Sequence, residues 1–351
     1  VRFCSRLDYN QWRSEGDIRQ MSTATNRAAT APPSQTTPGN LSSVQMRQWV
    51  AGGILILGII LALMDNLNIG WVVVGLWGGL LVWKPFHAIL ILYSIISVYP
   101  ILRVISISLR PTSNLLSRSL DLIPPGATIE SYISLFRDES FVLWLWNTLT
   151  ITITVSIIGV AVAATGAYAF SRWRFPGRRP ALIFLLTTQM IPAGMLLIPI
   201  FVIVAQLQLT NNIAGLMLAY ITTTVPFSIW ILKGYYDTIP PDLEEAAMVD
   251  GCNRMESFWR IILPLSTPAL SIVFLFNFLA AWAEFLVAKV ILQDPNVWTW
   301  ALGLNDLIGT FNTDWGKYAA GSVLVTIPVL ILFTWQSKYL ISGLTLGGVK
   351  G

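Results

Sequence analysis

Few residues in this chain could take part in catalysis. His87 is its only histidine, and 11% of the residues are charged, against about 25% in a typical soluble domain. An enzyme site would need a His–Asp pair, a metal cluster or paired carboxylates, and the spacing of the residues suggests none of these. The chain also lacks a Gly-x-x-x-x-Gly-Lys-Ser/Thr loop for nucleotide phosphates. We therefore predict no catalytic residue, no metal site and no cofactor, and an enzyme is the weaker alternative.

Residues 237–266 form a charged, amphipathic segment between two long apolar runs. Pro240 and Pro241 predict a helix start, because a proline in the first turn lacks only an N–H that would have no partner. Gly251 predicts a left-handed end to this helix, so the helix is short. Carboxylates in the first turn suit the positive end of the helix dipole, and this turn has three of them: Asp242, Glu244 and Glu245.

A second amphipathic helix is predicted directly after the first. Apolar residues recur in it at helical spacing beside arginines, until prolines break the pattern. The apolar positions are Phe258, Ile261 and Ile262, the arginines are Arg254 and Arg260, and the prolines are Pro264 and Pro268. The segment is therefore a pair of short helices joined by a sharp turn.

The spaced set Glu245-Ala246-Ala247, Gly251 and Ile261-x-Leu263-Pro264 resembles the EAA loop of ABC importer permeases. The resemblance implies that this loop docks into a cleft of a cytoplasmic ATPase subunit and carries its motion to the membrane helices. It gives a coupling role to Glu245, Ala246, Ala247, Asp250, Gly251, Ile261, Leu263 and Pro264. An interfacial helix pair lying on the lipid surface is the alternative.

The composition of the chain indicates a membrane protein. Hydrophobic residues make up 54% of it, and the mean hydropathy is +0.65. Several apolar runs approach the length of about 20 residues that a helix needs to cross a bilayer, and strand alternation is absent. These observations predict an all-α, polytopic transmembrane helical bundle in a lipid bilayer. The net charge of +4 lies mostly in loops, so it indicates topology and not a nucleic-acid partner.

We predict four parts along the chain. Residues 1–45 are polar and without periodicity, so we expect disorder there. Residues 46–85 hold two short apolar runs that predict a transmembrane hairpin, with a re-entrant or surface hairpin as the alternative. Residues 86–343 resemble the six-helix core of a type I importer permease, and residues 344–351 form a C-terminal tail. The six core spans are expected near 86–109, 141–170, 181–205, 213–236, 269–292 and 318–335.

The distribution of arginine predicts which loops face the cytoplasm. Arg172, Arg174, Arg178 and Arg179 crowd the loop after the span at 141–170, and cytoplasmic loops carry such an excess of positive charge. The turn at 206–212 has no charged residue and is expected on the opposite side. With the hairpin and the six core spans, both termini of the chain are then cytoplasmic.

Polar residues within the spans are candidates for a translocation pathway. Glu284 lies in the predicted span 269–292, where a charge costs about 2.5–3.5 kcal/mol or more and favours a functional or bundle-facing role. Asn277 lies seven residues earlier, nearly on the same helical face. Gln189 and Thr223 complete the set, because they belong to two spans that prolines interrupt. A static packing kink explains these prolines equally well.

The chain ends in Gly343-Leu344-Thr345-Leu346-Gly347-Gly348-Val349-Lys350-Gly351. This ending resembles that of the second permease subunit of carbohydrate importers, the maltose permease G type, from which Leu346 and Gly348 depart. The resemblance implies a tail that reaches the ATPase interface through Gly343, Leu344, Thr345, Gly347, Lys350 and Gly351. A frayed glycine-rich terminus is the alternative.

The same resemblance implies a function and a set of partners. It implies a permease subunit of a binding-protein-dependent ABC importer for a di- or oligosaccharide, in the plasma membrane, which is the inner membrane of bacteria. The implied partners are a second permease of the maltose permease F type, a cytoplasmic ABC ATPase dimer and an extracytoplasmic sugar-binding protein. Another solute, such as a phosphorylated polyol or a peptide, stays open because no residue recognises a sugar directly.

Overall fold

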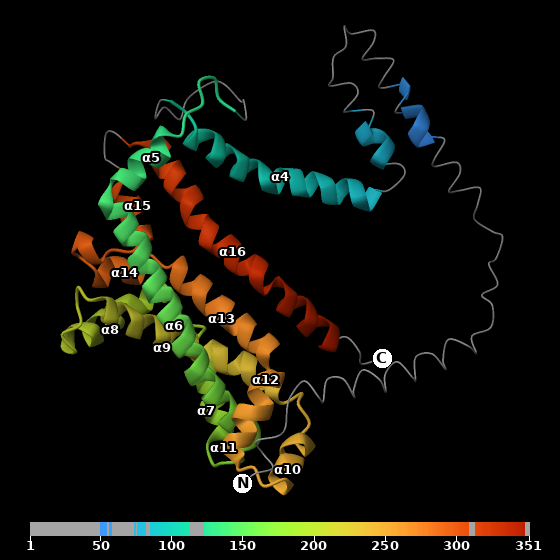
Figure 1. The fold of residues 1–351 in the computed structure, drawn as a ribbon, viewed down its shortest axis with the longest axis vertical. Helices are drawn as coiled ribbons and strands as arrows, with labels where there is room; N and C mark the ends of the chain where they lie inside the picture. The colour runs from blue at the N-terminus through green and yellow to red at the C-terminus, as the bar shows by residue number, and fades with distance from the viewer. Residues whose placement is uncertain are drawn as a thin grey trace, which may run out of the picture. The chain divides into compact units, whose positions relative to one another are not determined.

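The computed structural model describes residues 50–54, 56–57, 74, 76–81, 85–111, 123–308 and 313–347 (Figure 1). In these residues the regular structure is helical, and no strand occurs among them. The chain forms two compact units, whose described parts run from 50 to 103 and from 104 to 347. The predicted disordered segment 1–45 lies outside the described residues.

The first unit contains two helical pieces of the predicted hairpin, at 50–54 and 76–81, and most of α4 (Pro85–Ser108). The two pieces approach each other closely at glycines. A Cβ atom on Gly78 would lie 2.8 Å from Ile54 Cγ2, and one on Gly79 would lie 2.9 Å from the carbonyl oxygen of Ala51. Larger side chains at these two positions would therefore push the pieces apart.

Four described helices are long and apolar enough to cross a membrane, and they match four of the predicted spans. The membrane-length parts of these helices are Phe86–Ser108 of α4, Ser140–Arg172 of α6 (Glu139–Arg172), all of α9 (Ile213–Tyr236) and Trp315–Lys338 of α16 (Trp315–Gly347). Two bent helix pairs bring the number to six if each pair is one span.

The predicted span 181–205 is a broken helix, as the prolines within it predict. It consists of α7 (Arg178–Thr188) and α8 (Ala193–Gln206), which meet at 104°. Pro192 explains the break, because it has no N–H for the carbonyl of Thr188 and disfavours helical backbone at the residue before it. The carbonyl and N–H groups freed at such a break need protein or water as partners.

The predicted span 269–292, in contrast, is wrong as a single helix. Here α13 (Thr267–Trp282) ends before Glu284, and α14 (Leu286–Ile291) begins after it. The carboxylate of Glu284 accepts hydrogen bonds from the N–H groups of Val287 at 2.8 Å and Ala288 at 3.1 Å. A side-chain acceptor for the first N–H groups of a helix favours a new start at this point.

The centre of the second unit is α6, along which both α9 and α13 pack (Figure 1). Small residues on α6 allow this close approach. A Cβ on Gly159 would lie 2.8 Å from the Asn277 side chain of α13, and one on Gly166 would lie 3.3 Å from the Ile229 side chain of α9. These two glycines of α6 thus serve helix packing.

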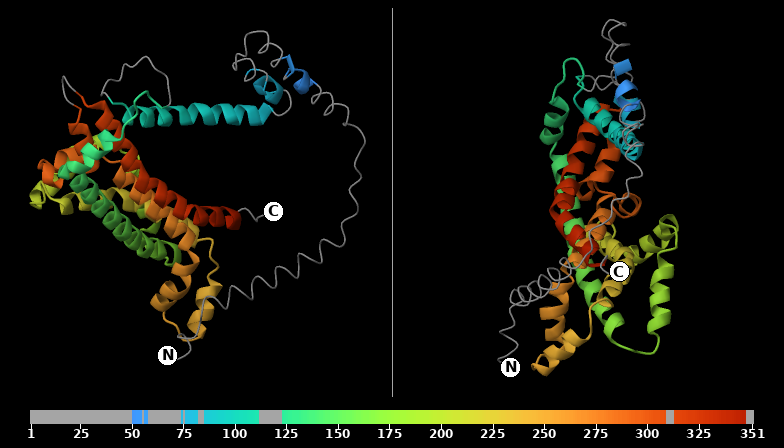
Figure 2. Two further views of the ribbon diagram at one scale, coloured as in Figure 1. Left: turned by 45° about the horizontal axis from the view of Figure 1, so that its top comes forward. Right: turned by 90° about the vertical axis from the view of Figure 1, so that its right-hand side faces the viewer.

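The two ends of α6 contact different loops. Near its start, Trp144 Nε1 donates to the carbonyl oxygen of Pro295 at 3.0 Å, and Asn147 Nδ2 donates to that of Asn296 at 3.0 Å. Asn211, in the uncharged turn, accepts from the N–H of Asp294 at 2.8 Å, which places that turn at the same end. The charged segment 237–266 lies at the other end, as both views in Figure 2 show for its helices α10 and α11.

The remaining described elements are short. They are α5 (Glu130–Arg137), α10 (Asp242–Val249), α11 (Arg254–Ser257), the π-helical turn η2 (Phe258–Ile262), α12 (Leu263–Leu265), the 3₁₀ turn η3 (Pro295–Val297) and α15 (Trp300–Asp306). Four of them, α10, α11, η2 and α12, form the charged segment. This segment connects α9 to α13.

Candidate functional site

The first helix of the charged segment, α10, begins and ends as predicted. Pro241 precedes its first residue, Asp242, and the first turn is acidic. Gly251 follows the helix with φ of +88°. The N–H of Cys252 donates to the carbonyl of Ala247 at 2.9 Å, and that of Gly251 donates to Met248 at 3.1 Å. This pair of bonds is a Schellman motif, which requires a left-handed residue and so favours glycine.

The predicted second helix is a composite of α11, η2 and α12. It starts with a reciprocal cap, in which the Asn253 side chain accepts from the N–H of Glu256 and the Glu256 side chain accepts from the N–H of Asn253. Within it, the N–H of Leu263 reaches back to the carbonyl of Phe258. Pro264 has no N–H to continue an α-helical ladder, so one wide turn accommodates it. A bend of 77° then leads into α13.

The two faces of α10 differ in burial. Glu245 and Ala246 are exposed, and so is Asp250 directly after the helix. Ala247 is buried, with Ile261 packed beside it, while Leu263 and Pro264 are partly buried. The predicted coupling residues thus divide into a group that faces outward and a group that holds the two loop helices together.

Large apolar side chains also point outward from this segment. Val249 is 87% exposed, and Met255 and Trp259 are each 61% exposed. They lie at the C-terminal end of α10, in α11 and in η2, close in sequence to the exposed carboxylates. These three side chains and Glu245 are all exposed on the short helices of this segment, and the set of Glu245, Val249, Met255 and Trp259 is here called the loop surface.

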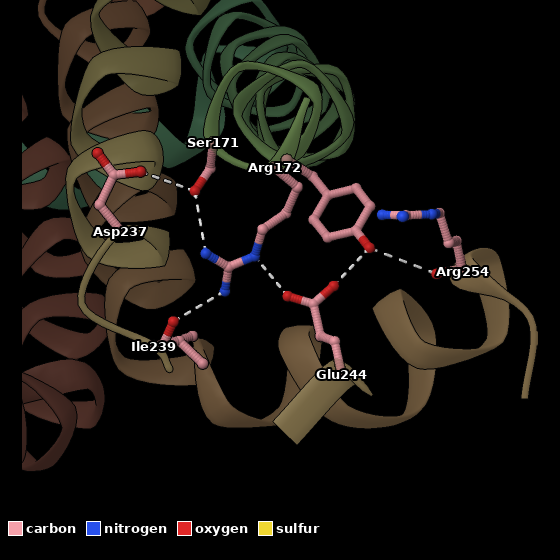
Figure 3. Close-up of polar contacts among 7 residues, drawn as sticks. Ser171, Arg172, Asp237, Ile239, Glu244 and Arg254 are labelled. Carbon is pink, nitrogen blue, oxygen red and sulfur yellow. Dashed lines mark hydrogen bonds and ion pairs between the residues drawn. The ribbon is translucent and has the colours of Figure 1, made fainter. Parts of the chain in front are cut away.

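Glu244, the neighbour of Glu245, points in the opposite direction. It is 6% exposed and forms an ion pair with Arg172, in the last turn of α6 (Figure 3). The hydroxyl of Tyr168 donates to the other carboxylate oxygen at 2.7 Å. Both oxygens of Glu244 are therefore held by α6.

Arg172 makes further contacts that the same view shows (Figure 3). Its Nη2 donates to the carbonyl of Ile239 at 3.0 Å, and its Nη1 lies 3.4 Å from the hydroxyl oxygen of Ser171. That hydroxyl donates to Asp237 at 2.7 Å, directly after α9. The end of α6 is thus bonded to the end of α9, to the linker and to α10.

Sequence reasoning missed the roles of Glu244, Arg172 and Tyr168. The sequence predicts Glu244 only as one of three first-turn acids and Arg172 only as one of the arginines that mark topology. One local signal existed, because Glu244 lies three residues before Ala247 and so shares its helical face. The partner could not be read locally, since Arg172 lies 72 residues earlier.

Of the four candidate pathway residues, Gln189 and Thr223 contact each other, whereas Asn277 and Glu284 have separate partners. Asn277 is buried and its Oδ1 accepts from Ser228 Oγ at 2.8 Å, whereas Glu284 accepts from the Tyr220 hydroxyl at 2.7 Å. Gln189 Nε2 donates to the backbone carbonyl of Thr223 at 3.2 Å. The helix break after Trp282 removes the shared face on which the pairing of Asn277 with Glu284 was predicted.

The predicted tail begins inside a helix. α16 continues to Gly347, so Gly343, Leu344, Thr345 and Gly347 have helical backbone. Their side chains, and Lys350 and Gly351 altogether, lie outside the described residues. A contact between the tail and another subunit stays a prediction.

Comparison with known proteins shows the family. Residues 156–345, more than half of the chain, match the family described as "Binding-protein-dependent transport system inner membrane component". The chain belongs to this family. The matched range covers the charged segment and both bent helix pairs, so the permease has the loop and the broken helices within its family core. The predicted family resemblance is confirmed.

Several relatives and one solved structure are similar over most of their lengths. The permease is 35% identical to the maltose/maltodextrin transport system permease MalG of Escherichia coli K12, over 76% of this chain and 95% of that protein. It is 36% identical to the galactooligosaccharides transport system permease GanQ of Bacillus subtilis, over 76% and 94%. A crystal structure of a bacterial ABC transporter that imports the acidic polysaccharide alginate has a chain 25% identical, with a TM-score of 0.66 over 72% of this chain and 94% of that one.

Proposed function

We propose that the permease is a membrane subunit of an ATP-driven importer for a sugar of the di- or oligosaccharide class. The names of its relatives support this cargo, since they include maltose and maltodextrin, galactooligosaccharides and, for a Streptomyces coelicolor relative at 33% identity, diacetylchitobiose. A phosphorylated polyol or a peptide, the alternatives from sequence, has no counterpart among these names.

The loop surface is the observation that carries the mechanism. An exposed carboxylate at Glu245, with exposed Val249, Met255 and Trp259 in the same segment, suits a protein cleft with a basic group and an apolar wall. We assign that cleft to a separate cytoplasmic ATPase subunit, because the permease has no phosphate-binding loop of its own. Ala246 and Asp250, also exposed, border this contact.

The remaining partners follow from the family. Its description names a binding protein, and a solved alginate transporter contains a periplasmic protein with bound alginate pentasaccharide. We propose an extracytoplasmic sugar-binding protein and a second permease subunit of the maltose permease F type as partners in the bacterial inner membrane. Both termini then lie in the cytoplasm, on the side of the charged segment, and the tail contacts the ATPase dimer.

In this mechanism the closure of two ATPase subunits moves α10, and the spans rock between inward-open and outward-open arrangements. The breaks between α7 and α8 and between α13 and α14 offer freed backbone groups of the kind that line transport pathways. We keep Asn277, Glu284, Gln189 and Thr223 as the candidate lining of that pathway. The protein itself carries out no chemical step.

Isolation of the native complex tests this function. An affinity tag on the permease should co-purify an ABC ATPase and a second permease from native membranes. After reconstitution into ATP-loaded vesicles, the complex should import a labelled maltodextrin or a related oligosaccharide when the binding protein is added. Glycerol 3-phosphate and a tripeptide serve as competing cargoes. Import of one of these in place of every sugar tested would contradict the assignment.

A further inference from the structure

We propose that Arg172 and Glu244 are a positioning pair that makes the last turn of α6 and the loop helix α10 move as one body during transport. This proposal rests on the proposed transport function. It adds a second mechanical route from α10 to the membrane helices. The chain itself connects α10 to α9 through residues 237–241. The ion pair also connects α10 to α6, the helix along which α9 and α13 pack.

Burial distinguishes this pair from an ordinary surface ion pair. The side chains of Arg172 and Glu244 are 10% and 7% exposed, whereas those of Arg137 and Glu130 are 75% and 63% exposed and lie 3.7 Å apart. Water screens the exposed pair, so it contributes little. The buried pair is only weakly screened, and separating its two charges would leave each charge buried without a partner.

The geometry holds α10 in orientation as well as in place. Tyr168 and Arg172 are four residues apart on α6, so their side chains leave the same face of the helix. One binds each carboxylate oxygen of Glu244. A carboxylate gripped at both oxygens resists rotation about its own axis, so α10 is constrained to turn with α6.

The same two α6 residues also hold the neighbouring parts of the loop. The ring of Tyr168 packs against that of Phe258 in η2, with centroids 4.7 Å apart. Arg172 uses a different nitrogen for each partner: Nε for Glu244, Nη2 for Ile239 and Nη1 for Ser171. A lysine has one compact ammonium group, so it could satisfy only part of this set.

The test compares variants of the pair in the intact, affinity-purified complex. Glu244→Gln keeps the shape of the side chain and removes its charge, and Arg172→Lys keeps the charge and removes the forked guanidinium group. The double variant Arg172→Glu with Glu244→Arg exchanges the two charges. Glu130→Gln, in the exposed pair, is the matched control. Coupling between two protein sites is typically worth about 5- to 150-fold. We expect both single variants to raise the ATP hydrolysed per sugar imported by about tenfold, and the double variant to recover part of the loss.

A distance measurement tests the pair without any sugar. Spin labels on noncanonical residues at the exposed positions 174 and 242 report the separation of the α6 end and the start of α10. In the wild type this separation should stay the same with and without ATP, and in Glu244→Gln it should change on ATP binding. An unchanged separation and a wild-type ATP-to-sugar ratio in both single variants would overturn the proposal. If wild-type complex imports no sugar while the labels behave as expected, the cargo assignment fails and the pair stands.

Discussion

Replacing Glu244 or Glu245 by alanine should damage the permease in two different ways, although the residues are neighbours. Glu244 is buried against Arg172 and Tyr168, whereas Glu245 is exposed on the loop surface. The first change removes a partner from an internal ion pair. The second removes an exposed carboxylate that makes no hydrogen bond or ion pair with the described part of the chain.

The magnitudes follow from these surroundings. Loss of Glu244 leaves the guanidinium of Arg172 in a site where it is 10% exposed, and breaking such a buried pair costs about 3–5 kcal/mol. That is a large share of the roughly 5–15 kcal/mol that stabilises a typical domain. Loss of Glu245 costs about 0.3–1 kcal/mol through the helix dipole. In an ATPase cleft, however, losing one partner of a desolvated charge pair costs about 2–5 kcal/mol of binding.

Two measurements on the purified proteins separate these effects. The fraction of permease that stays monodisperse after heating reports stability, and the amount of ATPase retained on a tagged permease reports docking. Glu244→Ala should melt at a clearly lower temperature than the wild type. Glu245→Ala should melt close to the wild type but lose most of its ATPase and its sugar uptake. Asp242→Ala is the matched control, because it also removes an exposed first-turn charge from α10.

Any of three results would refute the reasoning. Wild-type thermal stability in Glu244→Ala would show that the buried pair does not stabilise this end of the protein. Normal transport in Glu245→Ala, at matched amounts of membrane-inserted protein, would show that this carboxylate is not a coupling contact. A loss of ATPase in Asp242→Ala equal to that in Glu245→Ala would show that ATPase binding depends on the negative charge of the first turn in general and not on a contact of Glu245.

Three further predictions concern the loop turn, the topology and the tail. Gly251→Val should reduce uptake because the left-handed φ of +88° costs a β-branched residue about 1–2 kcal/mol or more; normal uptake at equal expression would contradict this. A cysteine at the exposed position 208 should react with an impermeant reagent in intact cells while one at 178 is protected, and the reverse pattern would invert the topology. Deleting residues 344–351 should leave the protein inserted but lower transport-coupled ATPase activity, and full activity of the truncated complex would remove the tail from the mechanism.

Local patterns in the sequence were sufficient for much of the fold. Apolar runs of bilayer length predicted the spans that became α4, α6, α9 and α16, since a long helix with few charges depends mainly on its own composition. Pro241 and Gly251 predicted the limits of α10 for the same reason. A helix start or a left-handed turn is decided by the conformational preferences of one or two residues. These predictions need no knowledge of which residues pack nearby.

Only the tertiary structure decided which charges are internal. Glu244 and Glu245 have the same side chain and the same helical turn, and they differ because the last turn of α6, 72 residues away, reaches one and not the other. The break at Glu284 likewise depends on Tyr220, 64 residues away, which donates to its carboxylate and supports it within the apolar bundle. Burial of a charge is favourable only when a distant donor lies within hydrogen-bond reach, and that distance exists only after the helices have packed.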